Sequence, residues 1–236
     1  RAKKPLPPKV KTVLNKLPQD ATIIDEYWIQ EPYAKVNIAS IPQLGGAKAY
    51  YISEVELSDV ERVAADKLIE ILSKELEPPK EEVDAKAYVL SEARRLAQKY
   101  KGAVGVFDEA SWDKIQYYIA KELIGFGSIQ VMIRDALIED ISADGAGIPI
   151  YIWHRRHESM PTNLTFVEEK ALDSLIVKLA HMAGKHISTA FPILDAMLPG
   201  QHRLAATFRQ EVSPKGTSFT IRKFREEPFS VIDLIE

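Results

Sequence analysis

The sequence predicts an α+β protein in which an N-terminal β-meander and a helical bundle unit precede an α/β unit with a mainly antiparallel sheet. Three observations predict this class. Short runs of β-favouring residues occur near both ends of the chain, whereas apolar residues recur at helical spacing between residues 58 and 124. Clusters of Pro and Gly separate the short runs. With 236 residues, 46% of them hydrophobic, the chain is long enough to bury a core in one or two domains.

Residues 1–20 are basic and contain four prolines, so an extended arm is predicted, with a short helix over 10–17 as the alternative. Three runs rich in β-branched and aromatic residues follow within 21–57, and Pro42 and Gly45-Gly46 interrupt them. A β-meander is therefore expected there. The runs cover residues 22–29, 35–38 and 50–57.

Three helices are predicted next, and with the meander they form a subdomain over 21–124. Ser58 and Glu61 have capping-box spacing at the start of the first helix. The second helix is expected over about 80–101 and the third over about 109–124. The residues predicted to face inward are Val60, Ala64, Leu68, Ile71 and Leu72, then Val83, Ala87, Leu90 and Ala97, then Trp112, Ile115, Ile119 and Leu123.

A second subdomain is predicted over 125–225, with a linker over 226–236. Strands are expected over 138–143 and 149–154, and then a helix whose capping box is formed by Thr165 and Glu168. Three further strands are expected over 193–198, 203–208 and 218–224. One helix against such a sheet gives a PAS-like α/β unit.

Several functional classes are excluded by composition. Without cysteine, the chain has no disulfide, no thiolate nucleophile and no cysteine-ligated metal. No apolar run approaches the roughly 20 residues that cross a bilayer. The formal net charge is −3, which argues against general polyanion binding.

The chain by itself is not a P-loop hydrolase. Gly184-Lys185 is followed by His186, and Leu179 occupies the position of the upstream glycine. The Gly125-Phe126-Gly127 segment likewise lacks the third glycine of a dinucleotide-binding loop.

No metal site is predicted either. His154 and His157 lie three apart on a predicted strand, which should point them to opposite faces. The arginines between them would repel a cation.

The most informative feature is a basic segment from Pro199 to Arg225, which contains one acid, Glu211. Arg203 begins one predicted strand and Arg222 ends the next, so a hairpin would bring both to one edge, where two guanidinium groups can bind phosphate oxygens. The alternative is that they are solvated edge charges that prevent sheet aggregation. Nucleic-acid binding is disfavoured because few aromatics are nearby in the sequence. The basic residues are Arg203, Arg209, Lys215, Arg222, Lys223 and Arg225, and the aromatics are Phe208, Phe219 and Phe224.

Strings in the same segment resemble a known family. Residues 191–200, 202–207 and 216–224 resemble the N-terminal domain of archaeal type II/IV secretion and pilus/archaellum assembly ATPases, the GspE/FlaI-like superfamily. Residues 125–129 and 138–145 match in order and spacing as well, whereas 1–124 match in general character alone. One departure is Gly200-Gln201-His202, where many relatives have Asp-Gly before the first arginine.

The resemblance implies a hexameric ATPase that acts at the cytoplasmic face of a membrane on a secretion, pilus or archaellum machine. Its partners would be its own C-terminal RecA-like core, further copies of the chain and a membrane platform protein, with no nucleic acid and no membrane insertion. ATP and Mg²⁺ would be held mainly by that core, so no catalytic residue is expected here. Arg203 and Arg222 match the arginines that reach over the phosphates, and Lys223 and Arg225 are weaker candidates.

Overall fold

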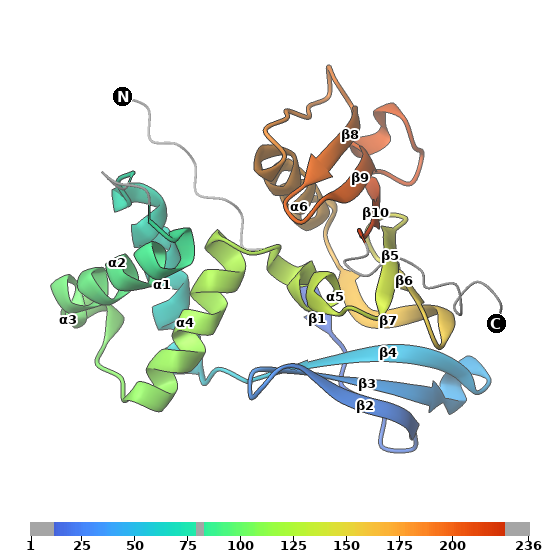
Figure 1. Ribbon diagram of the computed structural model, residues 1–236, viewed down its shortest axis with the longest axis horizontal. Helices are drawn as coiled ribbons and strands as arrows, with labels where there is room; N and C mark the ends of the chain where they lie inside the picture. Colours follow the sequence, from blue (N-terminus) through green and yellow to red (C-terminus); the bar gives the residue numbers. More distant parts are fainter. Residues whose placement is uncertain (1–11, 79–82, 225–236) are drawn as a thin grey trace, which may run out of the picture. The chain divides into compact units, whose positions relative to one another are not determined.

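The computed structural model describes residues 12–78 and 83–224, which form two compact units (Figure 1). The helical unit contains Gln30–Lys35 and Glu54–Val131. The sheet unit contains residues 12–29, Val36–Ser53 and residues 132–224. Residues 1–11 of the arm predicted over 1–20, and the predicted linker over 226–236, lie outside the described residues.

In the described part of the helical unit, the three predicted helices pack around one apolar core, together with a short fourth helix that was not predicted. None of the helices in the described ranges is long and apolar enough to cross a membrane. The helices are α1 (Asp59–Glu75), α2 (Ala85–Lys99), the short α3 (Lys101–Val104) and α4 (Glu109–Leu123). Their buried core consists of Ala64, Ala65, Leu68, Leu72, Val89, Ala93, Leu96, Val104, Trp112, Ile115 and Ile119.

The capping box at the start of α1 is confirmed. The Ser58 hydroxyl accepts from the Glu61 amide, and the Glu61 carboxylate accepts from the Ser58 amide at 2.7 Å. Glu61 is buried and also pairs with Lys114 of α4, so the first turn of α1 presents Glu61 to the core. Because successive helical residues are about 100° apart, Val60 is turned to solvent, and the prediction that it faces inward is wrong.

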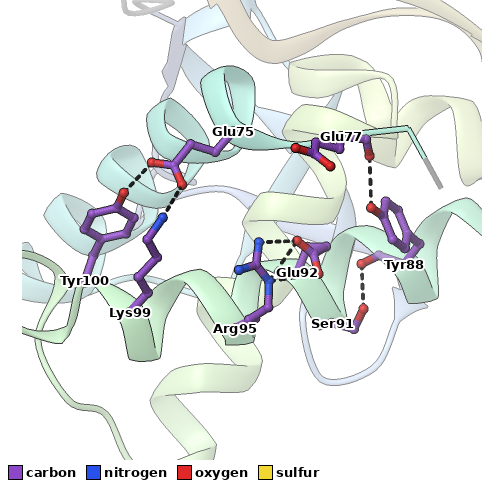
Figure 2. Close-up of polar contacts among 8 residues, drawn as sticks. All are labelled: Glu75, Glu77, Tyr88, Ser91, Glu92, Arg95, Lys99 and Tyr100. Carbon is purple, nitrogen blue, oxygen red and sulfur yellow. Dashed lines mark hydrogen bonds and ion pairs between the residues drawn. The ribbon is translucent and has the colours of Figure 1, made fainter. Parts of the chain in front are cut away.

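Polar contacts join the end of α1 to α2 (Figure 2). Glu75 accepts hydrogen bonds from Lys99, at 2.9 Å, and from Tyr100, while the carbonyl of Glu77 accepts from Tyr88. Helix α2 begins after its N-cap, Asp84, whose side chain accepts from the backbone of the first turn. Val83 therefore precedes the helix and is exposed, contrary to the predicted inward position.

The described residues of the sheet unit include a ten-stranded sheet, and the predicted α+β class is confirmed. Its strands run in the order β2-β3-β4-β7-β6-β5-β10-β9-β8, with β1 beside β7. The pairings among β5 to β10 are antiparallel, whereas β4 and β7 are parallel. The strands are β1 (Thr12–Leu14), β2 (Thr22–Gln30), β3 (Ala34–Ile41), β4 (Ala47–Glu54), β5 (Ile138–Ala143), β6 (Pro149–His154), β7 (Glu158–Phe166), β8 (Ile193–Leu198), β9 (His202–Thr207) and β10 (Ser218–Arg222).

The side chain of Asn163 on β7 joins the two halves of this sheet. Its amide accepts from the Ile52 amide and donates to the carbonyls of Ile52 and Asn15. The meander strands therefore group with the later strands, and not with the helices with which they are predicted to share a subdomain. Residues 12–14 pair with β7 as a strand, so the alternative of a helix over 10–17 is wrong.

Helix α6 (Glu169–Met182) packs against β7 and β8 through a buried apolar stripe. The capping box predicted from Thr165 and Glu168 does not form. Thr165 belongs to β7, where it pairs with Val13 and with Pro149, and Glu168 makes no side-chain cap bond. The stripe consists of Leu172, Leu175, Ile176 and Leu179.

Candidate functional site

One face of the strands β6, β5, β10, β9 and β8 is not covered by described residues. Burial alternates strictly along β8, β9 and β10, so every second side chain is exposed. Strand register then assigns the neighbouring residues of β5 and β6 to the same face. We call this surface the open face. It carries Asp140, Ser142, Tyr151, Trp153, Ile193, Asp195, Met197, Arg203, Ala205, Thr220 and Arg222.

Arg203 of β9 and Arg222 of β10 lie directly opposite each other on the open face. Figure 1 shows these two strands side by side. The two arginine side chains are 67% and 78% exposed. Opposed residues of antiparallel strands have Cβ atoms roughly 5 Å apart, so the hairpin brings the two guanidinium groups to one edge as predicted. Like charges in this position destabilise a sheet unless they are compensated.

Two aspartates supply that compensation. Arg203 donates to Asp195 of β8 through Nη2, at 2.8 Å, and through Nε, at 3.3 Å. Arg222 donates through Nε to Asp140 of β5 at 3.0 Å. The hydrogen bonds and charge of Asp195 raise the pKa of Arg203, and those of Asp140 raise the pKa of Arg222. Both guanidinium groups are therefore held on the open face by exposed ion pairs.

The turn that precedes Arg203 has the sequence Gly200-Gln201-His202, which departs from the pattern of the resembling family. It nevertheless closes the hairpin between β8 and β9. Gly200 and Gln201 both adopt positive φ, 82° and 61°, and Leu198 pairs with His202 across the turn. The Nδ1 atom of His202 then accepts from the Phe224 amide at 3.1 Å. His202 thus binds the chain two residues beyond Arg222, a positioning role that the sequence did not reveal.

Other basic residues of the segment have different surroundings. The Lys223 ammonium donates to the carbonyls of Met132 and Asp135, near the end of α5 (Gln130–Arg134). Arg209 pairs with Asp173 of α6 at 3.1 Å. Arg225 lies outside the described residues. The structure therefore brings Arg203 and Arg222 together, and directs Lys223 to backbone carbonyls.

Two aromatic side chains on the open face were missed. Trp153 and Tyr151 of β6 are 46% and 41% exposed, and Trp153 pairs with Asp140. The aromatics counted from the sequence are a poor guide here, because Phe208 and Phe219 are buried. Only strand register brings β6, about 50 residues earlier in the chain, to the arginines.

Comparison with known proteins identifies a family. The chain is 32% identical over 197 residues to Uncharacterized protein MJ1288 of Methanocaldococcus jannaschii, a match that covers 81% of this chain and 78% of that protein. This chain belongs to the MJ1288 family. Two other proteins of that organism are similar. Uncharacterized protein MJ0900 is 38% identical over 123 residues and Uncharacterized protein MJ0781 is 27% identical over 218 residues, 52% and 92% of this chain. The matched parts are 22% and 29% of those two relatives.

Two further comparisons add little to the assignment of this chain to the MJ1288 family. No family model matches the chain. The crystal structure of the VirB11 ATPase from the Brucella suis type IV secretion system, in complex with sulphate, aligns with a TM-score of 0.35 and 21% identity over 43% of this chain and 31% of that chain. A likeness at that level indicates no function for this chain.

A second polar cluster of this MJ1288-family chain is buried around Asp135. Its Oδ2 accepts from the hydroxyls of Tyr27, at 2.7 Å, and Tyr50, at 2.8 Å, and Tyr27 also contacts Nε2 of His154. Burial raises the pKa of both tyrosines and lowers the pKa of His154. We call these four side chains the Asp135 cluster. Asp135, Tyr50 and His154 are buried and Tyr27 is half-buried, so the hydrogen bonds of the cluster connect β2, β4 and β6 inside the sheet unit.

The histidines do not point to opposite faces as predicted. The rings of His154 and His157 are 5.0 Å apart, because β6 ends at His154 and a turn follows. Among residues 12–78 and 83–224, no three His, Asp or Glu side chains are arranged to hold a metal ion.

Proposed function

We propose that this chain is the N-terminal regulatory and docking region of a hexameric secretion- or pilus-type assembly ATPase. In this proposal Arg203 and Arg222 contact the phosphates of an ATP molecule that a RecA-like core presents. The observation that carries it is the cross-strand arginine pair on the open face. Two planar guanidinium groups side by side can each form paired hydrogen bonds with phosphate oxygens.

Exposure of the two ion pairs supports an exchange of partners. Water and salt screen exposed pairs, so they are weak. A polyphosphate carries several charges and offers more acceptor oxygens than one carboxylate. It can therefore replace Asp195 as the partner of Arg203 and Asp140 as the partner of Arg222. The paired carboxylates also keep the open face near neutral, which favours a ligand presented at short range over unspecific polyanions.

The role of the arginines follows from their chemistry. A guanidinium group stays protonated at neutral pH, so it stabilises charge on the β- and γ-phosphates and does not transfer a proton. ATP and Mg²⁺ would be held mainly by the core, where the metal ion neutralises phosphate charge. Closure of the open face over ATP, followed by release, would turn hydrolysis into rigid-body movement at the cytoplasmic face of a membrane.

The lengths of two relatives are compatible with such a core. In MJ0900 and MJ0781 more than two thirds of the protein lies outside the match. MJ1288 has less than a quarter outside it. In a protein as short as MJ1288, the core that presents the nucleotide would be a separate polypeptide.

The test is the pair of variants Arg203→Ala and Arg222→Ala in the full-length protein. We expect each to reduce ATP turnover at least tenfold, since loss of one preorganised charge contact has effects of that order or larger. Arg95→Ala is the matched control, because Arg95 is an exposed arginine paired with Glu92 on α2. Wild-type turnover in both open-face variants would contradict the proposal.

A docking role for residues 1–124, without contact to nucleotide, is the second candidate. Val60 and Val63 are exposed one turn apart on α1, so they offer an apolar strip to a partner. The partner would be the membrane platform protein of the machine. We expect the double variant Val60→Asp/Val63→Asp to lose capture of that protein without losing the helical fold. Retained capture would contradict this docking site.

A further inference from the structure

An aromatic side chain stands in the same row of the open face as the arginine pair. Trp153 pairs with Asp140, Asp140 with Arg222, and Arg222 with Arg203. Side chains directly opposite in antiparallel strands project from the same face. These four therefore form one row across β6, β5, β10 and β9. Neighbouring strands are about 4.8 Å apart, which puts Trp153 roughly 10 Å from Arg222 along the row.

Trp153 is only about half covered, although its strand lies inside the sheet and not at an edge. Tyr151, two residues earlier on β6, is exposed beside it. Large aromatic rings bury much apolar area when they are covered, so an exposed pair on a sheet face favours a ligand with a flat apolar surface. A nucleobase is such a ligand, because each base offers a π-face to an aromatic ring.

We propose that Trp153 stacks on the base of the nucleotide whose phosphates contact Arg203 and Arg222, an inference that rests on the proposed function. The row sets the orientation of the ligand, with phosphates over β10 and β9 and the base over β6. The separation of Trp153 from the arginine pair is comparable to that between the base and the terminal phosphate in an extended nucleoside triphosphate. The site thus takes a nucleoside triphosphate and not merely a polyphosphate.

The charges of the open face favour one nucleotide over a nucleic-acid strand. Asp140 lies in the row and pairs with Arg222, and Asp195 of β8 lies beside the row and pairs with Arg203. A strand that crosses the face would bring further phosphates against these carboxylates, whereas one triphosphate can meet the arginines alone. Nucleic-acid binding also depends on many neutralised phosphates, and the open face has two cations.

The test compares two ligands in the full-length protein. Dissociation constants for ATP with Mg²⁺ and for inorganic tripolyphosphate, which has the phosphates but no base, are measured by titration calorimetry. In Trp153→Ala we expect ATP affinity to fall about tenfold, the size typical of one lost base stack, with tripolyphosphate affinity unchanged. Trp153→Phe keeps a ring and should bind ATP nearly as the wild type does.

Trp28→Ala is the matched control, because Trp28 is an equally exposed tryptophan on β2 of the same unit. It should change neither constant. Arg203→Ala and Arg222→Ala should weaken both ligands.

Unchanged ATP affinity in Trp153→Ala, with losses in the arginine variants, would overturn the stacking and leave the proposed function intact. Equal losses for ATP and tripolyphosphate in Trp153→Ala would also overturn it, since the ring would then support the phosphate site. Tighter binding of an unstructured oligonucleotide than of ATP would do the same. If the arginine variants bind both ligands as the wild type does, the proposed function itself fails.

Discussion

Ion pairs in the two units of this chain differ in how much water reaches them. In the helical unit, Lys121 of α4 pairs with Glu54, and the side chains are 7% and 4% exposed. Glu54 also accepts from the Tyr117 hydroxyl, and the Lys121 ammonium lies over the Tyr118 ring. In the sheet unit, Arg203 and Asp195 are 67% and 60% exposed. The first pair is enclosed by its own unit, whereas the second is open to an external anion.

This difference separates a structural ion pair from an exchangeable one. Loss of one partner from a buried pair leaves an uncompensated charge in a poorly solvated place. Loss of one partner from an exposed pair leaves a charge that water solvates. The buried ion pair of the helical unit therefore has a large effect on folding. The exposed ion pair of the sheet unit has a small effect on folding and leaves Arg203 available for binding.

The largest effect is expected for Lys121→Met, which keeps the apolar stem and removes the charge. Glu54 then stays buried without its cation, so the free energy of unfolding should fall by about 3–5 kcal/mol. Urea unfolding followed by circular dichroism measures this change. In the double variant Glu54→Gln/Lys121→Met, which still offers an acceptor to Tyr117, most of the loss should be recovered. A loss below about 1 kcal/mol in the single variant, the range of exposed pairs, would abolish the distinction between the two units.

A somewhat smaller loss is expected for Asp135→Ala in the sheet unit. It removes the acceptor of the Tyr27 and Tyr50 hydroxyls and leaves both within the fold without it. The free energy of unfolding should fall by about 2 kcal/mol, since an unsatisfied buried hydroxyl such as that of Tyr50 costs roughly 1–3 kcal/mol, whereas Tyr27 is partly buried and keeps its contact with His154. Tyr50→Phe removes one donor and leaves Tyr27 on Asp135, so it should cost less. If the two variants were equally stable, the cluster would contribute little.

The Asp135 cluster also shows what the sequence could not predict. Tyr27 lies 108 residues from Asp135 and 127 from His154. Nothing local marks such residues, because each contact depends on the pairing of distant strands. The arginine pair was predictable, since β9 and β10 are adjacent in the chain and one hairpin brings them together. Trp153 joins the same face through β5, so it required the sheet order.

Local signals succeeded where no tertiary pairing competed with them. Ser58 and Glu61 form their capping box at the start of a surface helix. The same spacing at Thr165 and Glu168 failed, because β7 extends through Phe166 and Thr165 is needed for pairing with β1 and β6. Val60 was misplaced because the capping Glu61, a charged residue, takes the inward position next to it. Its carboxylate is held by Ser111 and Ser58, which lower its pKa to about 2.

A moderate decrease in the free energy of unfolding is expected at acidic pH. Burial lowers the pKa of His154 below its usual 6.5, so the folded protein favours the neutral ring. The unfolded chain then binds more protons as the pH falls below 6.5, and the free energy of unfolding should decrease, by at most about 1.4 kcal/mol per pH unit. Urea midpoints at pH 7.5, 6.5 and 5.5 measure this slope. His154→Gln should flatten it, and an identical slope in that variant would assign the effect to other groups.

The smallest effect on folding, and the most informative for binding, is expected for Asp195→Asn. Asp195 is solvent-exposed, so loss of its compensation of the arginine pair should lower the urea midpoint only slightly. Arg203 loses its internal carboxylate, however, and tripolyphosphate affinity should rise about threefold at low salt, with less gain at higher ionic strength. Glu92→Gln, which releases Arg95 in the helical unit, is the matched control and should change nothing. A fall in affinity would mean that Asp195 orients Arg203 for phosphate and does not compete with it. The exposed pair would then be part of the site's architecture, as the buried pair is part of the helical core.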